Sequence, residues 1–176
     1  MDEDPSLTLE KFDHARLDEL VLMWRAGLRA AVGIDDPHPF EEHKRYFLTE
    51  VFPRNTVRLA LLGGRLVGFV AATPDSVAQL HVRVGYQRRG IGTRLLAWAK
   101  EQSSGSLWLY TFARNRGARA FYERSGFVAT AYDFEPEWRL EDVKYEWSRE
   151  EDAPPPHTAG PRLRGTTPCC PTPDTS

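Results

Sequence analysis

Apolar residues between positions 7 and 147 follow two periods, the alternating pattern of strands and the wider spacing of amphipathic helices. Short runs rich in β-branched and aromatic residues predict strands. These runs are residues 7–12, 56–62, 65–72, 77–82, 107–111, 127–132 and 143–147. The Gly63-Gly64 pair between the second and third runs predicts a hairpin turn.

Helical spacing appears in the segments between these strands. The first helix is indicated by Leu17, Leu20, Val21, Trp24 and Leu28. A second helix is predicted over residues 40–51, with Pro53 helping to end it, and two more over residues 91–102 and 116–124. The irregular order of strands and helices predicts an α/β protein with a mixed sheet, covered on both faces by about four helices.

Length and charge narrow the class of protein. The chain has 176 residues, about the size of one domain, with 41% hydrophobic and 27% charged residues, as in soluble globular proteins. The formal net charge of -2 gives no basic field for nucleic acid or anionic membranes. The acidic N-terminus does not resemble a signal peptide, and no apolar run is long enough to span a membrane. We therefore expect a cytoplasmic protein without nucleic-acid or membrane partners, and an oligomer is possible.

The composition changes near Arg149, after which prolines interrupt a polar sequence. This change predicts a folded domain over residues 1–148 and a disordered, Pro-rich tail over residues 149–176. Both cysteines, Cys169 and Cys170, lie next to each other in that tail. The domain therefore has no disulfide framework, no spaced metal-ligand set and no cysteine nucleophile, and no metal is expected.

The candidate chemistry begins at residues 87–93, between the strand ending at Val82 and the helix over residues 91–102. A glycine-rich turn at a helix N-terminus offers unpaired backbone N–H groups and partial positive charge to a phosphate. Gly90 and Gly92 let an anion approach the backbone closely. Leu95 replaces the third glycine of a dinucleotide-binding fingerprint, and the Gly-Lys-Ser/Thr of a Walker A loop is absent from this sequence.

Two motifs resemble those of the Gcn5-related N-acetyltransferases (GNAT). Gln87, Gly90 and Gly92 match the acetyl-CoA loop Q/R-x-x-G-x-G/A, and residues 115–127 match a second signature, N-x-x-A-x-x-x-Y-x-x-x-G-F. The resemblance covers residues 7–147 and implies the acyl-CoA N-acyltransferase fold of this family. It also implies acetyl-CoA as co-substrate and an amine as acceptor.

The resemblance assigns roles to individual residues of this chain. It implies that the strand over residues 77–82 splays from its neighbour and that the backbone of Leu80, His81 and Val82 binds the pantetheine arm. Asn115 would contact the cofactor further on, and Tyr122 would protonate the departing thiolate. The residues implied to surround the pyrophosphate are Gln87, Arg88, Arg89, Gly90, Ile91, Gly92 and Thr93.

Two positions depart from the family pattern. Tyr110 stands where some relatives place a glutamate base, and Arg83-Val84 replaces a common Asp-Pro pair. His81, Asp75 and Glu41 are candidates to relay a proton through water, and each is as readily an ordinary strand, turn or surface residue. The general base therefore stays open.

The last predicted loop is acidic, which favours a cationic amine acceptor. Its charged residues are Asp133, Glu135, Glu137, Glu141 and Asp142 against Arg139. The main functional hypothesis is transfer of acetyl from acetyl-CoA to a primary amine of a small molecule or peptide. The alternative is a non-catalytic acyl-CoA sensor or regulatory subunit on the same fold. A third reading, acetylation of aminoacyl-tRNA, is disfavoured by the net negative charge.

Overall fold

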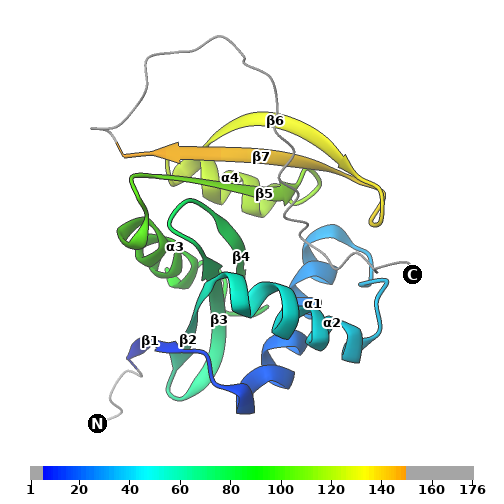
Figure 1. The fold of residues 1–176 in the computed structure, drawn as a ribbon, viewed down its shortest axis with the longest axis vertical. Coiled ribbons are helices and arrows are strands. Elements are labelled where there is room, and N and C mark those ends of the chain that lie inside the picture. The colour runs from blue at the N-terminus through cyan, green and yellow to red at the C-terminus, as the bar shows by residue number, and fades with distance from the viewer. Residues whose placement is uncertain (1–5, 150–176) are drawn as a thin grey trace.

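The computed structural model describes residues 6–149, which form two antiparallel sheets (Figure 1). The first sheet has the order β1 (Leu7–Lys11), β2 (Thr56–Leu62), β3 (Arg65–Ala72) and β4 (Val77–Val82). The second has the order β5 (Ser106–Phe112), β7 (Leu140–Ser148) and β6 (Val128–Glu135). The predicted tail, apart from Arg149, lies outside the described residues.

The helices are α1 (Leu17–Val32), α2 (Phe40–Tyr46), α3 (Ile91–Gln102) and α4 (Arg116–Arg124). The second predicted helix is shorter in α-form than expected, because the chain widens into a π-helical turn at Phe47–Val51 and then tightens into a 3₁₀ turn at Phe52–Arg54. Pro53 lies within that last turn, where its missing N–H interrupts no longer helix. Among the described residues, the helices are too short or too polar to cross a membrane.

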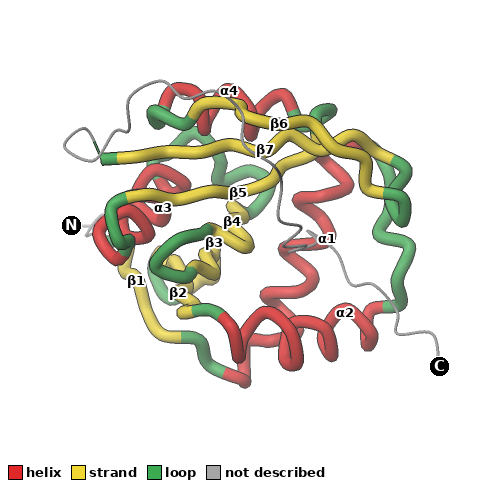
Figure 2. The backbone as a smooth tube through the Cα atoms, turned by 45° about the horizontal axis from the view of Figure 1, so that its top comes forward, coloured by secondary structure: helices red, strands yellow, loops and turns green. Residues whose placement is uncertain are grey.

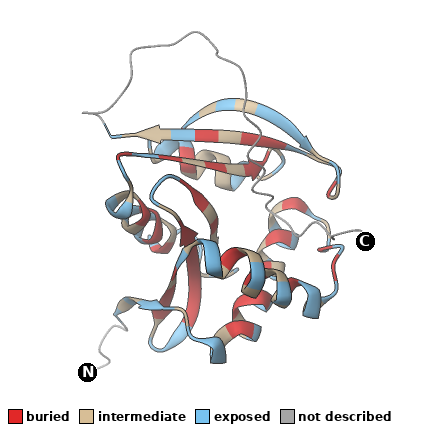
Figure 3. Cartoon of the chain, viewed as in Figure 1, coloured by how far each residue is buried: buried red, intermediate tan, exposed pale blue. Residues whose placement is uncertain are grey.

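The core fills both faces of the first sheet (Figures 1 and 3). Leu59 and Phe69 point to one face, where they pack with Trp24 of α1. Ala60 and Val70 point to the other face, where α3 and the second sheet cover them. Side chains of a strand alternate between faces, so two-sided burial explains why these strands are apolar almost throughout. The predicted α/β class with a sheet covered on both faces is confirmed.

The two sheets meet at one end and separate at the other (Figure 2). A parallel bridge joins Ser76 to Trp108, and the Trp108 N–H donates to the Asp75 carbonyl at 3.0 Å. Among the described residues this bridge is the only pairing between the two sheets. It is parallel, whereas the pairings within each sheet are antiparallel, so it makes the combined sheet mixed. The two strands therefore diverge toward Val82 and Phe112.

The final two strands are longer than predicted. β6 continues to Glu135 and β7 begins at Leu140, so the predicted acidic loop is a tight hairpin with Arg139 in the left-handed region at φ 53°. The two strands stay paired through residues of low β-propensity, because the residues before them in each strand are already paired. Asp133 and Asp142 consequently face each other across the strands.

Gly68 is required by the packing of β3 on β4 and α3. A Cβ at this position would lie 2.8 Å from the carbonyl oxygen of His81 and 3.1 Å from Cδ1 of Leu95. We expect Gly68→Ala to lower the free energy of unfolding by about 1–3 kcal/mol because backbone must move. Gly27→Ala in α1 is the control: its Cβ meets nothing within 4 Å, and it should stabilise by about 0.5–1 kcal/mol. Urea unfolding measures both free energies. Equal free energies of unfolding for the two variants would contradict the steric requirement for Gly68.

Candidate active site

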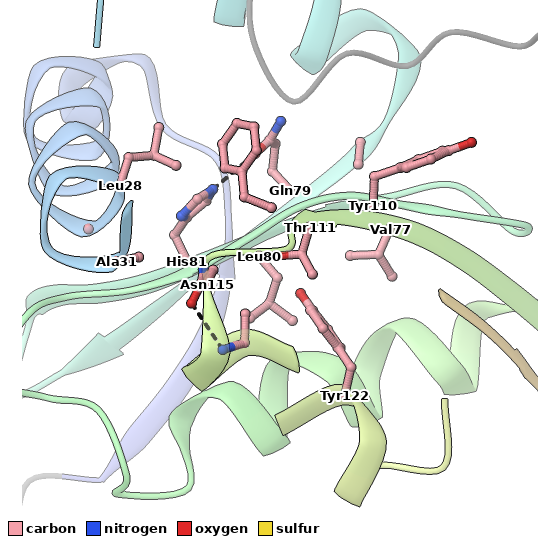
Figure 4. Close-up of a pocket in the computed structure, with 14 residues that line it drawn as sticks. Leu28, Ala31, Val77, Gln79, Leu80, His81, Tyr110, Thr111, Asn115 and Tyr122 are labelled. Carbon is pink, nitrogen blue, oxygen red and sulfur yellow. Dashed lines mark hydrogen bonds between the residues drawn. The ribbon is translucent and has the colours of Figure 1, made fainter. Parts of the chain in front are cut away.

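A pocket of about 70 Å³ opens where β4 and β5 diverge (Figure 4). Segments of α1, β4, β5 and α4 contribute its wall. The lining residues include Leu28, Gln79, Leu80, His81, Tyr110, Thr111, Phe112, Asn115 and Tyr122. Strand separation thus brings together side chains that are far apart in the sequence.

The backbone of β4 presents alternate residues to this opening. The Arg83 N–H donates to the Val67 carbonyl at 2.8 Å, and His81 is opposite Phe69 in the register. Because hydrogen-bonding direction alternates along an antiparallel pair, the His81 backbone pairs with β3. The N–H and C=O groups of Leu80 and Val82 face the β5 side, where they can bind an extended amide chain.

The loop after β4 ends in an open helix N-terminus. Arg88 and Gly90 adopt left-handed conformations at φ 62° and 80°, and Gly90 provides no capping side chain to α3. The Arg94 N–H donates to the Gly90 carbonyl at 3.0 Å, which is the first bond of the helix. The preceding N–H groups, of residues 91–93, therefore have no intrahelical partner and point outward from the helix start. This arrangement suits a phosphate group.

Side chains around the loop leave this helix start accessible. Gln87, Arg88 and Arg89 are exposed, and the Arg89 guanidinium stacks on the Tyr86 ring at 5.1 Å from the centroid. A Cβ on Gly92 would lie 3.4 Å from the Phe121 ring of α4. A larger residue at Gly92 would therefore push into the space between α3 and α4.

Arg83, which replaces the acidic residue of many relatives, anchors the start of the loop. Its Nε donates to the Leu66 carbonyl at 2.7 Å, and its guanidinium contacts Glu19 of α1 at 2.8 Å. Arg114 and Arg119 likewise bond within the protein, to the Val32 carbonyl and the Tyr145 hydroxyl. These contacts hold the three arginine side chains against the rest of the fold.

Asn115 caps the helix that carries Tyr122. Its Oδ1 accepts a hydrogen bond from the Ala118 N–H at 3.1 Å, as expected of an N-cap asparagine. Residues 115–127 therefore define a short capped helix with a fixed start. Asn115 also lines the pocket, so its role as helix cap is compatible with a contact to a molecule in the pocket.

Tyr122 is the buried aromatic residue of α4, with 7% of its surface exposed. Its ring packs against Phe127 and Tyr145, with centroids 5.7 and 6.1 Å away. Figure 4 shows its hydroxyl directed into the pocket, toward Leu80 and Thr111. The phenol and the open edge of β4 therefore border the same space.

His81 is the only one of the three candidate relay residues that lines this pocket in the described chain. Its ring packs against Trp24 and Phe69, at centroid distances of 5.3 and 5.4 Å, and Nε2 lies 2.9 Å from Gln79 Oε1. Burial, together with the charge of His43, lowers the pKa of His81 to about 3. The imidazole is therefore neutral at neutral pH and a weak base.

The other two candidates are engaged elsewhere. The Asp75 carboxylate accepts a hydrogen bond from Ser104, and Glu41 is exposed and paired with Lys44 at 3.3 Å. Neither lines the pocket.

A buried polar chain that the sequence did not reveal lies beside α1. His38 Nδ1 is 3.0 Å from Asp36 Oδ1, and its Nε2 is 2.6 Å from Glu137 of the β6–β7 hairpin. Asp36 also lies 2.8 Å from His43 Nδ1, and Arg25 donates to the His38 carbonyl at 2.8 Å. Burial favours protonation of Asp36, but the adjacent His43 ring and the hydrogen bonds from His38 outweigh it and lower the pKa of Asp36 to about 2.

This chain ties the α1–α2 connection to the β6–β7 hairpin. The two ring nitrogens of His38 each contact a carboxylate, that of Asp36 on one side and that of Glu137 on the other. The sequence showed Asp36 and His38 only as part of a proline-rich connection. Their partner Glu137 is 99 residues from His38, which no local spacing could indicate.

Asp142 is a second buried acid near the pocket. It lies opposite Phe112 on one side and Asp133 on the other, with 8% of its surface exposed. Its Oδ1 has no hydrogen-bond partner among the described residues. Burial, reinforced by the charges of Glu135 and Asp133, raises the pKa of Asp142 to about 7.

The described residues contain no group of three or more His, Cys, Asp and Glu side chains arranged to hold a metal ion.

The raised pKa of Asp142 makes stability depend on pH. The folded protein retains a proton that the unfolded chain releases above pH 3.8, so wild-type stability falls as the pH rises from about 4 to about 7. Asp142→Asn should therefore be more stable than wild type by about 1–3 kcal/mol at pH 8, with the gain fading near pH 4. Urea unfolding at both pH values, with exposed Glu141→Gln as control, measures this difference. An equal gain at both pH values would rule out the protonation account.

Comparison with known proteins places this chain among acetyltransferases. The sequence model of the Acetyltransferase (GNAT) family matches residues 21–127, more than half of the 176-residue chain. Among curated proteins, no sequence gives a significant match.

Several solved structures share the fold. Apo YjaB from Escherichia coli has a TM-score of 0.68 and 17% identity, covering 82% of this chain and 99% of its own. The PaiA N-acetyltransferase of Thermoplasma acidophilum, in complex with coenzyme A, has a TM-score of 0.65 and 20% identity, covering 81% and 99%. YncA from Salmonella typhimurium, solved with its cofactor acetyl-CoA, has a TM-score of 0.62 and 15% identity, covering 86% and 99%. With the family match, these similarities show that the chain belongs to the GNAT acetyltransferase family.

Proposed function

We propose that the protein transfers the acetyl group of acetyl-CoA directly to a primary amine of a small molecule or peptide. One observation carries this proposal: the phenol of Tyr122 and the open backbone edge of β4 at Leu80 border one pocket. Membership of the family and the coenzyme A or acetyl-CoA in two similar structures support the donor. A cytoplasmic location remains a prediction.

The residues around the divergence fit the donor molecule. Leu80 and Val82 would hydrogen-bond the amides of the pantetheine arm as an added strand would. The pyrophosphate would lie at the start of α3, against backbone N–H groups and the partial positive charge of the helix. Residues proposed to surround it are Gln87, Arg88, Arg89, Gly90, Ile91, Gly92 and Thr93. His81 would contribute by shaping the pocket wall, since its backbone pairs with β3.

The transfer then needs a nucleophile, an oxyanion donor and an acid. The neutral amine attacks the thioester carbonyl, a C–N bond forms, and the C–S bond breaks. The Val82 N–H is positioned on the open edge to stabilise the developing oxyanion. The Tyr122 phenol gives its proton to the departing thiolate, whose ordinary pKa is near 8.5 against about 10 for a phenol. The attacking nitrogen loses one proton to water as the amide forms, and the phenolate takes one proton back from water, so the protons balance.

The proton of an ammonium substrate is proposed to leave without a dedicated carboxylate base. Tyr110 lines the pocket where some relatives place glutamate, and burial makes His81 a weak base. The acceptor would accordingly react from the fraction that is already neutral, or lose its proton to water in the pocket.

Replacing Tyr122 by Phe tests the acid role. We expect kcat for a good amine acceptor to fall about 10²–10⁴-fold, because the thiolate loses its proton donor. The Kd for acetyl-CoA should stay within about twofold, since the ring and its packing are kept. Thiol release and calorimetric titration give the two quantities.

Tyr110→Phe is the matched control, because it removes the other tyrosine hydroxyl of the pocket lining. Its kcat should change by less than about threefold, as expected of a group outside the proton transfer. Wild-type turnover in Tyr122→Phe would refute the acid role. Acetyl-CoA binding without thiol release from any amine, peptide or aminoacyl-tRNA would favour the non-catalytic sensor.

A further inference from the structure

The pocket has two halves, one on each side of the gap between β4 and β5. Tyr122 belongs to the apolar cluster on the side of α3 and α4, and Leu80 packs against that cluster. Leu28 belongs to the cluster around Trp24 of α1, and Ala31 packs against it. Figure 4 shows Leu28 and Ala31 on one side of the pocket and Tyr122 on the other. The proposed acid therefore marks one half as the side of the departing thiolate, and the α1 half is left for the acceptor.

The α1 half presents no charged side chain. In the part of the chain that the structure describes, none of the residues that line the pocket is Asp, Glu, Lys or Arg. The acids of the β6–β7 hairpin, which suggested a cationic acceptor, are not among them. His81 is neutral at neutral pH, and its Nε2 already lies 2.9 Å from Gln79 Oε1. A charged group on the acceptor would therefore lose hydration here without meeting an opposite charge.

The walls of this half are largely apolar. Leu28 and Ala31 come from α1, and Tyr110 and Phe112 come from β5. Side chains alternate along a strand, so the two rings lie on one face of β5. Phe112 is also part of the same buried cluster as Leu28. Such walls favour a ligand group that gains by leaving water.

Gly27 leaves an opening in the helix that forms one wall. Glycine inside a helix is destabilising relative to alanine, and Gly27 lies within α1. Packing does not require it: unlike Gly68, it would carry a Cβ that meets no atom within 4 Å. Met23 and Trp24, one turn earlier on the same side of α1, are buried, so this side faces the protein. Since Gly27 lines the pocket, the open space beside it belongs to the pocket.

We propose that the α1 half of the pocket binds an uncharged, apolar group attached to the reacting amine, and that Gly27 provides the room for this group. A residue that departs from local preference without a packing reason is typical of a functional site. The acceptor class is then a hydrophobic monoamine, which enters from the α1 side toward Leu80 and Tyr122. This inference rests on the proposed acetyltransferase function and narrows its acceptor.

Three primary amines test the acceptor class: pentylamine, putrescine and ethylamine. Pentylamine and putrescine have equal length and differ at the far end, which is a methyl group or an ammonium group. We expect kcat/KM, measured by thiol release, to be at least about tenfold higher for pentylamine than for putrescine, because the far ammonium loses hydration. It should also be at least about tenfold higher than for ethylamine, because pentylamine buries more methylene groups.

Replacing Gly27 tests the residue that provides the room. Gly27→Leu should lower the ratio of kcat/KM for pentylamine to that for ethylamine at least about tenfold, since its side chain occupies the space of the longer acceptor. Gly27→Ala, which we expect to be more stable than wild type, should lower the ratio by a smaller factor. Ala26→Leu is the matched control: it places leucine at the neighbouring exposed position of α1, outside the pocket lining, and should keep the ratio. An unchanged ratio in both Gly27 variants, or an equal loss in Ala26→Leu, would overturn the role of Gly27.

Failure of this inference differs from failure of the enzyme proposal. If the wild type acetylates putrescine as well as pentylamine, the hydrophobic class is refuted and the acetyltransferase stands. If no amine is acetylated, the acetyltransferase proposal fails, and binding decides the inference separately. Pentylamine should then shift the backbone amide resonances of Leu28 and Ala31 saturably in the wild type, and putrescine should not. Equal shifts with both amines, or none with either, would overturn the inference.

Discussion

The divergence of β4 from β5 is the constraint on which the rest of the structure depends. The strands touch at the bridge between Ser76 and Trp108 and then separate, leaving the backbone groups of Leu80 and Val82 without a strand partner. Such groups need hydrogen bonds, which the amides of the proposed pantetheine arm would supply. The same separation gives the Tyr122 hydroxyl access to the space beside that edge. One structural irregularity thus underlies both the proposed cofactor site and the proposed position of the acid.

Buried polar side chains join the β6–β7 hairpin to the α1–α2 connection. The chain of contacts runs from Glu137 through His38 to Asp36 and His43 and holds these two segments together. Asp142 differs because its buried Oδ1 has no hydrogen-bond partner among the described residues. Burial and the neighbouring acids therefore favour its protonated form and raise its pKa to about 7.

The departures from the family pattern have local explanations. Arg83 joins the loop to β3 and α1 through its guanidinium, so the loop start is held without the usual Asp-Pro pair. Tyr110 leaves the pocket without a carboxylate at that position, and His81 is made a weak base by its burial. These features affect how the acceptor loses its proton, and they leave the backbone edge of β4 unchanged.

The sequence by itself determined the elements, the α/β class and the two motifs, because period, glycine positions and motif spacing are local properties. It also located Tyr122 and the turn at Gly90, since a capped helix and a glycine-rich helix start have short signatures. Only the tertiary structure decided that the backbone groups of Leu80 and Val82, and not those of His81, are turned away from β3, because this depends on the register of the two strands. It also decided that Asp142 is buried in a strand and that Glu137 meets His38, since burial and long-range pairing arise when distant strands pack together.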